Sequence, residues 1–217
     1  MPEGLQVRST SNILQIDGDY RNLFFKRAGR NTTSSGRPTA TFPGVTPVVF
    51  MRPLLANRGI FVVEFTPVSG GNWRLVTEWP VEYYVFDLPD AQTFGLNVYN
   101  EAGQLVFNAV ERPLDVIAAV QVPNQNGYTY SGLPTGKYAY SVSYSRPGAW
   151  ASQYDPVSGS WDNTDLREKL FSTNNGFFTQ FLDVSTWWGS PMYDQDFYDF
   201  SGPPPIVTII DVAGIPT

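Results

Sequence analysis

Carboxylates and aromatic side chains gather in the last third of the chain, where they could bind a carbohydrate or hydrolyse one. Residues 150–200 include eight acidic residues, thirteen aromatic residues and two basic ones. Two carboxylates across a glycosidic bond can cleave it, and aromatic faces can stack on sugar rings. The acidic candidates are Asp155, Asp162, Asp165, Asp183, Asp194, Asp196 and Asp199. The aromatic candidates for partner or glycan contact are Trp150, Trp161, Trp187, Trp188 and Tyr193.

The same segment offers oxygen ligands at spacings that Ca²⁺ accepts. The two candidate patterns are Asp155-x-x-Ser158-x-Ser160 and Asp194-x-Asp196-x-x-Asp199. Neither continues into the twelve-residue calcium loop with its central Gly and terminal Glu. The alternative is a solvated acidic turn, and acids in such segments are usually solvated while aromatic residues pack in cores or interfaces. We therefore assign no metal site, no cofactor and no catalytic residue.

Composition removes most other catalytic chemistry. The chain of 217 residues contains no His and no Cys. A Ser-His-Asp triad, a thiol nucleophile and the usual zinc sites are thereby excluded. Carboxylate chemistry of the glycosidase kind is the form of hydrolysis that we keep as an alternative. The expectation is that the protein is not an enzyme.

The charge balance argues against a nucleic-acid partner. Fourteen basic residues stand against twenty acidic ones, for a net charge of -6, whereas duplex binding needs many cations to neutralise phosphates. The longest apolar stretches, such as Val116–Val120, are far too short to span a bilayer. Residues 1–4 show no signal-peptide pattern. We expect a protein made in a cytoplasm that neither binds nucleic acid nor inserts into a membrane.

The elements that must position these residues read as strands. Short β-branched and aromatic runs such as Ile60–Phe65 and Val81–Asp87 alternate with turns rich in Gly and Pro, which is typical of an all-β chain. Thr164–Leu170 is the exception, because its composition allows two helical turns. Residues Arg27–Gly44 contain little apolar surface and read as a long exposed loop.

Two stretches resemble each other without a gap. Residues 4–21 and 95–112 align at an offset of 91 (95 minus 4), with Gly, Leu, Val, Leu and Arg identical at matched positions. Each copy reads as a β-hairpin, and Asn12 and Gly103 share a turn position that tolerates positive φ. Internal similarity of this kind indicates duplication; convergence of two ordinary hairpins is the alternative.

The second copy resembles a hairpin of small tail-tip proteins of long-tailed bacteriophages. That group carries the pattern G-L-x-V-x-N-x-x-G-x-L-x-F-D followed by an Arg, which residues Gly95–Asn108 and Arg112 match with Asn108 in place of Asp. In the first copy Asp17 and Arg21 match, but Ser9, Asn12 and Ile16 depart from the pattern. The resemblance implies a structural role in the virion and implies no catalytic residue.

Together these observations predict an all-β chain in three parts. Residues 1–89 form a first β-sandwich-like unit and residues 90–146 a second β unit, the two related by duplication. Residues 147–217 form an acidic, aromatic, loop-rich extension with a terminal strand. The resemblance implies a tail-tip or baseplate protein of the virion, assembled in the host cytoplasm, that oligomerises and contacts other phage tail proteins. A module that binds a host-surface receptor or glycan is the alternative, and a carboxylate glycoside hydrolase is a third.

Overall fold

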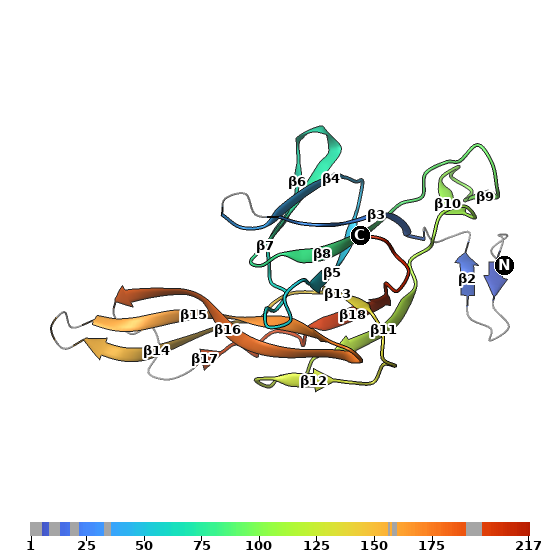
Figure 1. Cartoon of the computed structure of the whole chain (residues 1–217). Coiled ribbons are helices and arrows are strands. Elements are labelled where there is room, and N and C mark those ends of the chain that lie inside the picture. The colour runs from blue at the N-terminus through green and yellow to red at the C-terminus, as the bar shows by residue number, and fades with distance from the viewer. Residues whose placement is uncertain are drawn as a thin grey trace.

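The computed structural model describes residues 6–8, 14–17, 22–32, 36–155, 157, 160–189 and 197–217. The described part is built from antiparallel strands. It contains one short 3₁₀ turn, Ser69–Gly71, between β6 (Val62–Val68) and β7 (Asn72–Thr77). The prediction of an all-β fold is therefore confirmed. Figure 1 shows the longest strands extending to one side of the molecule and the small hairpins lying on the other.

A six-stranded sheet forms the centre of the fold. Its order is β11 (Val116–Gln121), β18 (Ile206–Asp211), β13 (Tyr138–Val142), β5 (Val48–Pro53), β8 (Val81–Asp87) and β3 (Phe24–Arg30). The sheet takes strands from all three segments that the sequence distinguishes. The boundaries at residues 89 and 146 stay predictions. One edge strand, β3, also contacts the chain that leads into the other, β11, where Phe24 and Pro113 form an isolated bridge.

The two halves of this sheet correspond strand for strand. In one half β8 lies between β3 and β5, and in the other β18 lies between β11 and β13. Val48 pairs with Phe86, and Ala139 (48 plus 91) pairs with Ile210. β3 has a bulge between Phe25 and Arg27, and β11 has one at the equivalent positions, 116 and 118. The similarity found in the hairpins therefore continues through the sheet as a shared topology and register.

Two smaller sheets repeat the correspondence. The first has the order β4 (Thr39–Pro43), β7 (Asn72–Thr77), β6 (Val62–Val68), and the second begins with β12 (Tyr128–Tyr130), β16 (Gly176–Gly189), β15 (Ser160–Thr173). The second sheet then adds β14 (Pro147–Asp155) and β17 (Phe197–Tyr198). Strands β4 and β12 thus occupy equivalent places, and β14 and β17 are additions to the second half.

Two segments differ from what the sequence predicts. Thr164–Leu170 is not helical but lies inside β15, because β14 and β16 pair with this segment on both sides. The segment expected to be rich in loops contains β15 and β16, both of 14 residues. The sequence also predicts a long loop between Arg27 and Gly44. Residues 27–30 of that stretch are the end of β3, and residues 39–43 form β4. Ladder hydrogen bonds over many residues override local composition in these places.

Both faces of the central strands β5, β8, β13 and β18 carry buried side chains, which follows from alternation along a strand. Val49 and Met51 belong to one core cluster, with Leu75 of β7 and Phe177 of β16. Phe50, between them in sequence, belongs to a second cluster that Val212 and Ile215 complete after β18. The first cluster joins the large sheet to the smaller sheets as in a sandwich.

Candidate assembly interface

The second copy of the repeat is a hairpin of β9 (Asn97–Tyr99) and β10 (Leu105–Asn108). Asn97 pairs with Asn108, Val98 with Phe107, and Tyr99 with Leu105. The first copy, β1 (Gln6–Arg8) and β2 (Leu14–Asp17), pairs Gln6 with Asp17, Val7 with Ile16 and Arg8 with Leu14. Every pair is displaced by 91 residues, and the bulge falls at the same step. The prediction that both copies are hairpins is confirmed.

Asn100 and Gly103, the Asn and Gly of the phage-like pattern, build the turn of this hairpin. The Gln104 amide donates to Asn100 Oδ1 at 2.8 Å, and the Gly103 amide donates to the Asn100 carbonyl at 2.9 Å. Gly103 has a φ of 71°, the left-handed conformation predicted for this position. Asn12, its predicted counterpart, lies outside the described residues.

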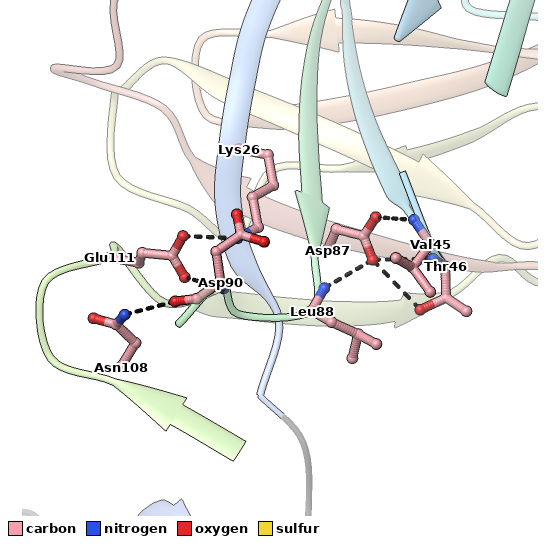
Figure 2. Close-up of polar contacts among 8 residues, drawn as sticks. All are labelled: Lys26, Val45, Thr46, Asp87, Leu88, Asp90, Asn108 and Glu111. Carbon is pink, nitrogen blue, oxygen red and sulfur yellow. Dashed lines mark hydrogen bonds and ion pairs between the residues drawn. The ribbon is translucent and has the colours of Figure 1, made fainter. Parts of the chain in front are cut away.

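Asn108 fastens the end of the hairpin to the chain that precedes it. Its side chain is fully buried, and Nδ2 donates to the Asp90 carbonyl at 2.8 Å, as Figure 2 shows. Oδ1 accepts from the Val110 amide at 2.7 Å. An Asp, the usual residue of the phage pattern here, could make the second bond but could not donate the first. The amide is therefore matched to this site.

Lys26 of β3 joins the first half of the chain to the base of the second hairpin. Its ammonium lies 2.8 Å from Asp90 Oδ2 and 2.7 Å from Glu111 Oε1 (Figure 2). The Asp90 amide donates to Glu111 Oε2 at 3.2 Å. Behind these charges the Phe24 and Phe107 rings meet edge to face, with centroids 5.8 Å apart. One side of the hairpin is thus held against the body of the protein.

Asp87 organises the neighbouring end of β8. This buried carboxylate accepts hydrogen bonds from the amides of Val45, Thr46 and Leu88 at 2.6, 3.0 and 2.7 Å (Figure 2). Three backbone donors on one carboxylate fix the loop before β5 and the start of the connection to the second hairpin. Asp211, at the equivalent place in β18, accepts from the Ala213 amide at 2.7 Å.

Four apolar side chains in and beside the second hairpin are exposed. Phe94, Leu96, Tyr99 and Val110 are 66%, 54%, 51% and 45% exposed. β9 and β10 form a sheet of two strands, and no third strand pairs with them in the described part of the chain. A two-stranded sheet is marginal by itself, and open strand edges invite pairing with another chain. We call these four side chains the exposed apolar residues of the hairpin.

The tryptophans predicted to contact a glycan or partner lie in the long strands of the other smaller sheet. Trp150 is in β14, Trp161 in β15, and Trp187 and Trp188 in β16. Trp150 pairs with Thr164, Asn163 with Trp187, and Asp162 with Trp188. The backbones of the four tryptophans therefore share one end of this sheet. Tyr193 lies outside the described residues.

Two of the acidic candidates make hydrogen bonds to nearby serines. Asp165 accepts a hydrogen bond from Ser185 Oγ at 2.9 Å on the neighbouring strand. The hydroxyl and the amide of Ser201, two residues after Asp199, donate to Asp199 and lower its pKa. Asp194 and Asp196 lie outside the described residues. Within the part that the structure describes, no group of three or more acidic side chains is placed to hold a metal ion.

Sequence reasoning missed two polar sites. Arg146 and Glu168 form a buried bidentate ion pair, and Lys26 forms the contacts at the base of the hairpin. Neither has a local signal, since the partners are 22 and 85 residues apart in the chain. The sequence held one further signal of the repeat. At the offset of 91, Leu23 and Leu114 are also identical.

No helix in the described residues is long and apolar enough to cross a membrane. A scan against protein-family models and searches of curated proteins and of solved structures found no match to this chain.

Proposed function

We propose that this chain is a structural protein of a bacteriophage tail tip or baseplate, without enzymatic activity, that acts by assembling with other subunits. The observation that carries the proposal is the exposure of the apolar residues of the second hairpin, Phe94, Leu96, Tyr99 and Val110. Leu96 and Tyr99 lie within the stretch that resembles the hairpin of phage tail-tip proteins, and Phe94 and Val110 flank it. Exposed apolar side chains near one another are typical of surfaces that a partner covers.

The hairpin is suited to such a contact because it is both anchored and exposed. Asn108 and Lys26 hold its base through buried or half-buried polar bonds. Its exposed apolar residues are left to solvent in the single chain. A partner subunit that packs against them would bury apolar surface and cover the open strand edges. We take a second copy of this chain as the first partner and other tail proteins as further partners.

Purified virions of the phage that encodes the chain test the proposal. Mass spectrometry of gradient-purified particles, and of tails separated from capsids, is expected to find the chain in the tail fraction. An antibody against the chain is expected to label the tail tip in electron micrographs. Absence of the chain from the particles, together with a stable monomer in solution, would contradict the proposal.

A receptor- or glycan-binding module is the second candidate, favoured by the tryptophans that the register brings to one end of the five-stranded sheet. Trp187 and Trp188 are consecutive in β16, and consecutive positions in a strand belong to opposite faces of its sheet. Each is therefore tested by its own variant, Trp187→Ala or Trp188→Ala. A glycan array and a host-cell binding assay check this candidate, and no signal in either would eliminate it.

A further inference from the structure

We propose that a cavity between the two halves of the chain binds a small, uncharged, amphipathic molecule. The cavity has a volume of about 490 Å³, within the range of sites that hold small organic ligands. Its walls come from β5 and β6 in the first half and from β13, β15 and β16 in the second. The site therefore exists only when the two halves are joined.

The cavity arises where the two halves meet in the central sheet. The ladder between β5 and β13 contains one residue pair, Met51 with Tyr140. By contrast, β5 forms six pairs with β8. Beyond the single pair the two strands separate, and both Pro47, just before β5, and Tyr144, after β13, line the cavity. A gap in an otherwise continuous sheet is thus the source of the space.

The wall from the first half is apolar. It includes Val49, Ile60, Val62, Phe65 and Leu75. All five belong to the main core cluster or pack against it. Empty apolar space in a core is costly because the lining atoms lose packing partners. This wall selects an apolar body for the ligand.

The wall from the second half is rich in hydroxyl groups. Ser143, Tyr144, Ser145 and Thr179 all line the cavity. The Ser143 and Ser145 hydroxyls are bonded within the protein. The Ser143 hydroxyl accepts from the Ile206 amide and keeps its own proton to donate, and the Ser145 hydroxyl donates to the Glu168 carbonyl and keeps its lone pairs. We assign these two hydroxyls to a polar group of the ligand. Tyr144 Oη and Thr179 Oγ1 are cut off from solvent, so they do not face the cavity.

The charges in the wall are already neutralised, which indicates an uncharged ligand. Glu168 Oε1 lies 2.6 Å from Arg146 Nη2. Lys169 Nζ lies 2.6 Å from Glu78 Oε2 and donates to the Asp183 carbonyl at 2.9 Å. A carboxylate or ammonium on the ligand would be desolvated without a free counter-charge. An alcohol, ester or amide on an apolar body meets the chemistry of both walls.

A fluorescence titration with N-phenyl-1-naphthylamine, an uncharged apolar probe, tests the cavity in the full chain. We expect saturable binding, and displacement of the probe by 1-decanol. Decanoate has a body of similar length with a charged head, and it is expected to compete at least tenfold more weakly. No saturable binding to protein that melts cooperatively would overturn the proposal. Equal competition by decanol and decanoate would overturn it as well.

Variants distinguish binding in the cavity from unspecific binding elsewhere on the protein. Val62→Trp fills the apolar wall and is expected to abolish probe binding, whereas Val45→Trp, on an exposed loop residue, leaves it unchanged. Ser143→Ala and Ser145→Ala remove one hydroxyl each. Each is expected to weaken decanol binding by about fivefold or more, the effect of one lost hydrogen bond, while probe binding persists. Folded Val62→Trp protein that binds the probe like the natural chain would refute the assignment, and the two conservative variants decide it if Val62→Trp does not fold.

Discussion

The amide of Leu114 donates a hydrogen bond to the carbonyl of Leu23 at 2.7 Å, and these two leucines are equivalent positions of the repeat (23 plus 91). Beside them the Phe25 amide donates to the Arg112 carbonyl at 2.8 Å. The equivalent strands β5 and β13 also meet each other, antiparallel, at the centre of the sheet. Contacts between equivalent elements are what a two-fold relationship produces. The two halves therefore complete one sheet.

Breaking the ion pair of Arg146 and Glu168 is expected to be strongly destabilising. The two side chains are 2% and 5% exposed, and two hydrogen bonds of 2.6 Å join them. Arg146→Ala leaves the carboxylate buried and unpaired, so we expect a loss of about 3–5 kcal/mol in the free energy of unfolding. Urea denaturation measures it.

The exposed pair of Arg74 and Glu64 provides the control for this experiment. Arg74→Ala is expected to cost less than about 1 kcal/mol, as surface pairs do. The double variant Arg146→Met/Glu168→Met removes both buried charges and is expected to recover much of the loss. Equal effects of Arg146→Ala and Arg74→Ala would contradict the account.

Gly176 allows the closest backbone approach in the second half of the chain. A Cβ atom at this position would lie 1.9 Å from the Tyr130 carbonyl oxygen, in the ladder between β12 and β16. The Tyr140 hydroxyl also donates to the Gly176 carbonyl. Gly176→Ala must therefore displace β12, and we expect a loss of about 3 kcal/mol or more, at the upper end of single substitutions.

Gly36 is the matched control, because its φ is 80° and a Cβ atom there would meet nothing within 4 Å. Gly36→Ala is expected to cost about 1–2 kcal/mol, from backbone strain alone. Thermal unfolding followed by circular dichroism measures both variants. A Gly176→Ala protein as stable as Gly36→Ala would mean that β12 is not packed as described.

Glu82 is expected to make the stability of the protein depend on pH. Burial by itself raises the pKa of Glu82, but hydrogen bonds from Arg30 and Lys137 and the Lys137 charge outweigh it, and the pKa lies below its ordinary value of 4.5. The carboxylate form is thus favoured more in the folded than in the unfolded chain. Its contribution is present above pH 4.5 and is lost as the pH falls from there through the lowered pKa.

Chemical denaturation at a series of pH values from 7 to about 3 tests this dependence. Glu82→Gln cannot titrate, and it leaves the positive charges of Arg30, Arg52 and Lys137 without their shared partner. The variant is expected to be less stable at neutral pH and to lose less stability on acidification. A parallel pH profile for the variant and the natural chain would assign the acid sensitivity to other groups.

Asn108→Asp tests the match between the hairpin and its anchor. The substitution restores the usual residue of the phage pattern, but it removes the donor to the Asp90 carbonyl and places a carboxylate in a fully buried site. An unsatisfied buried acceptor costs about 1–3 kcal/mol. We expect faster hydrogen exchange at the amides of β9 and β10, with β15 and β16 unaffected. Unchanged exchange in the hairpin would show that Asn108 does not hold it.

The sequence was enough to predict the two hairpins and the all-β class, but it did not show how far the repeat extends. Val49 and Tyr140 occupy equivalent places, as do Phe50 and Ser141, yet these pairs share little beyond their positions in the strand. Identity therefore ends near Leu114 while the topology continues. The remainder of the repeat is visible only in the register of the strands, which depends on pairing between distant parts of the chain.

The misassigned helix has a related cause. Asp165, Arg167, Glu168 and Lys169 look like the polar face of a surface helix. In the structure Glu168 and Lys169 are buried in β15, because Arg146 and Glu78 neutralise them from other parts of the chain. A buried charged residue in a strand can be predicted only when its charge partner is known. The same dependence on distant partners hid the polar anchor of the second hairpin.

Sedimentation velocity of the purified full chain tests the central claim, assembly through the exposed apolar residues of the second hairpin, most directly. The natural chain is expected to sediment as an oligomer in a concentration-dependent manner. The double variant Phe94→Ser/Leu96→Ser is expected to sediment as a folded monomer. Val45→Ser, which removes an apolar side chain that is 70% exposed elsewhere, is expected to behave like the natural chain. A natural chain that stays monomeric at all concentrations, or an oligomer that the double variant leaves intact, would contradict the claim.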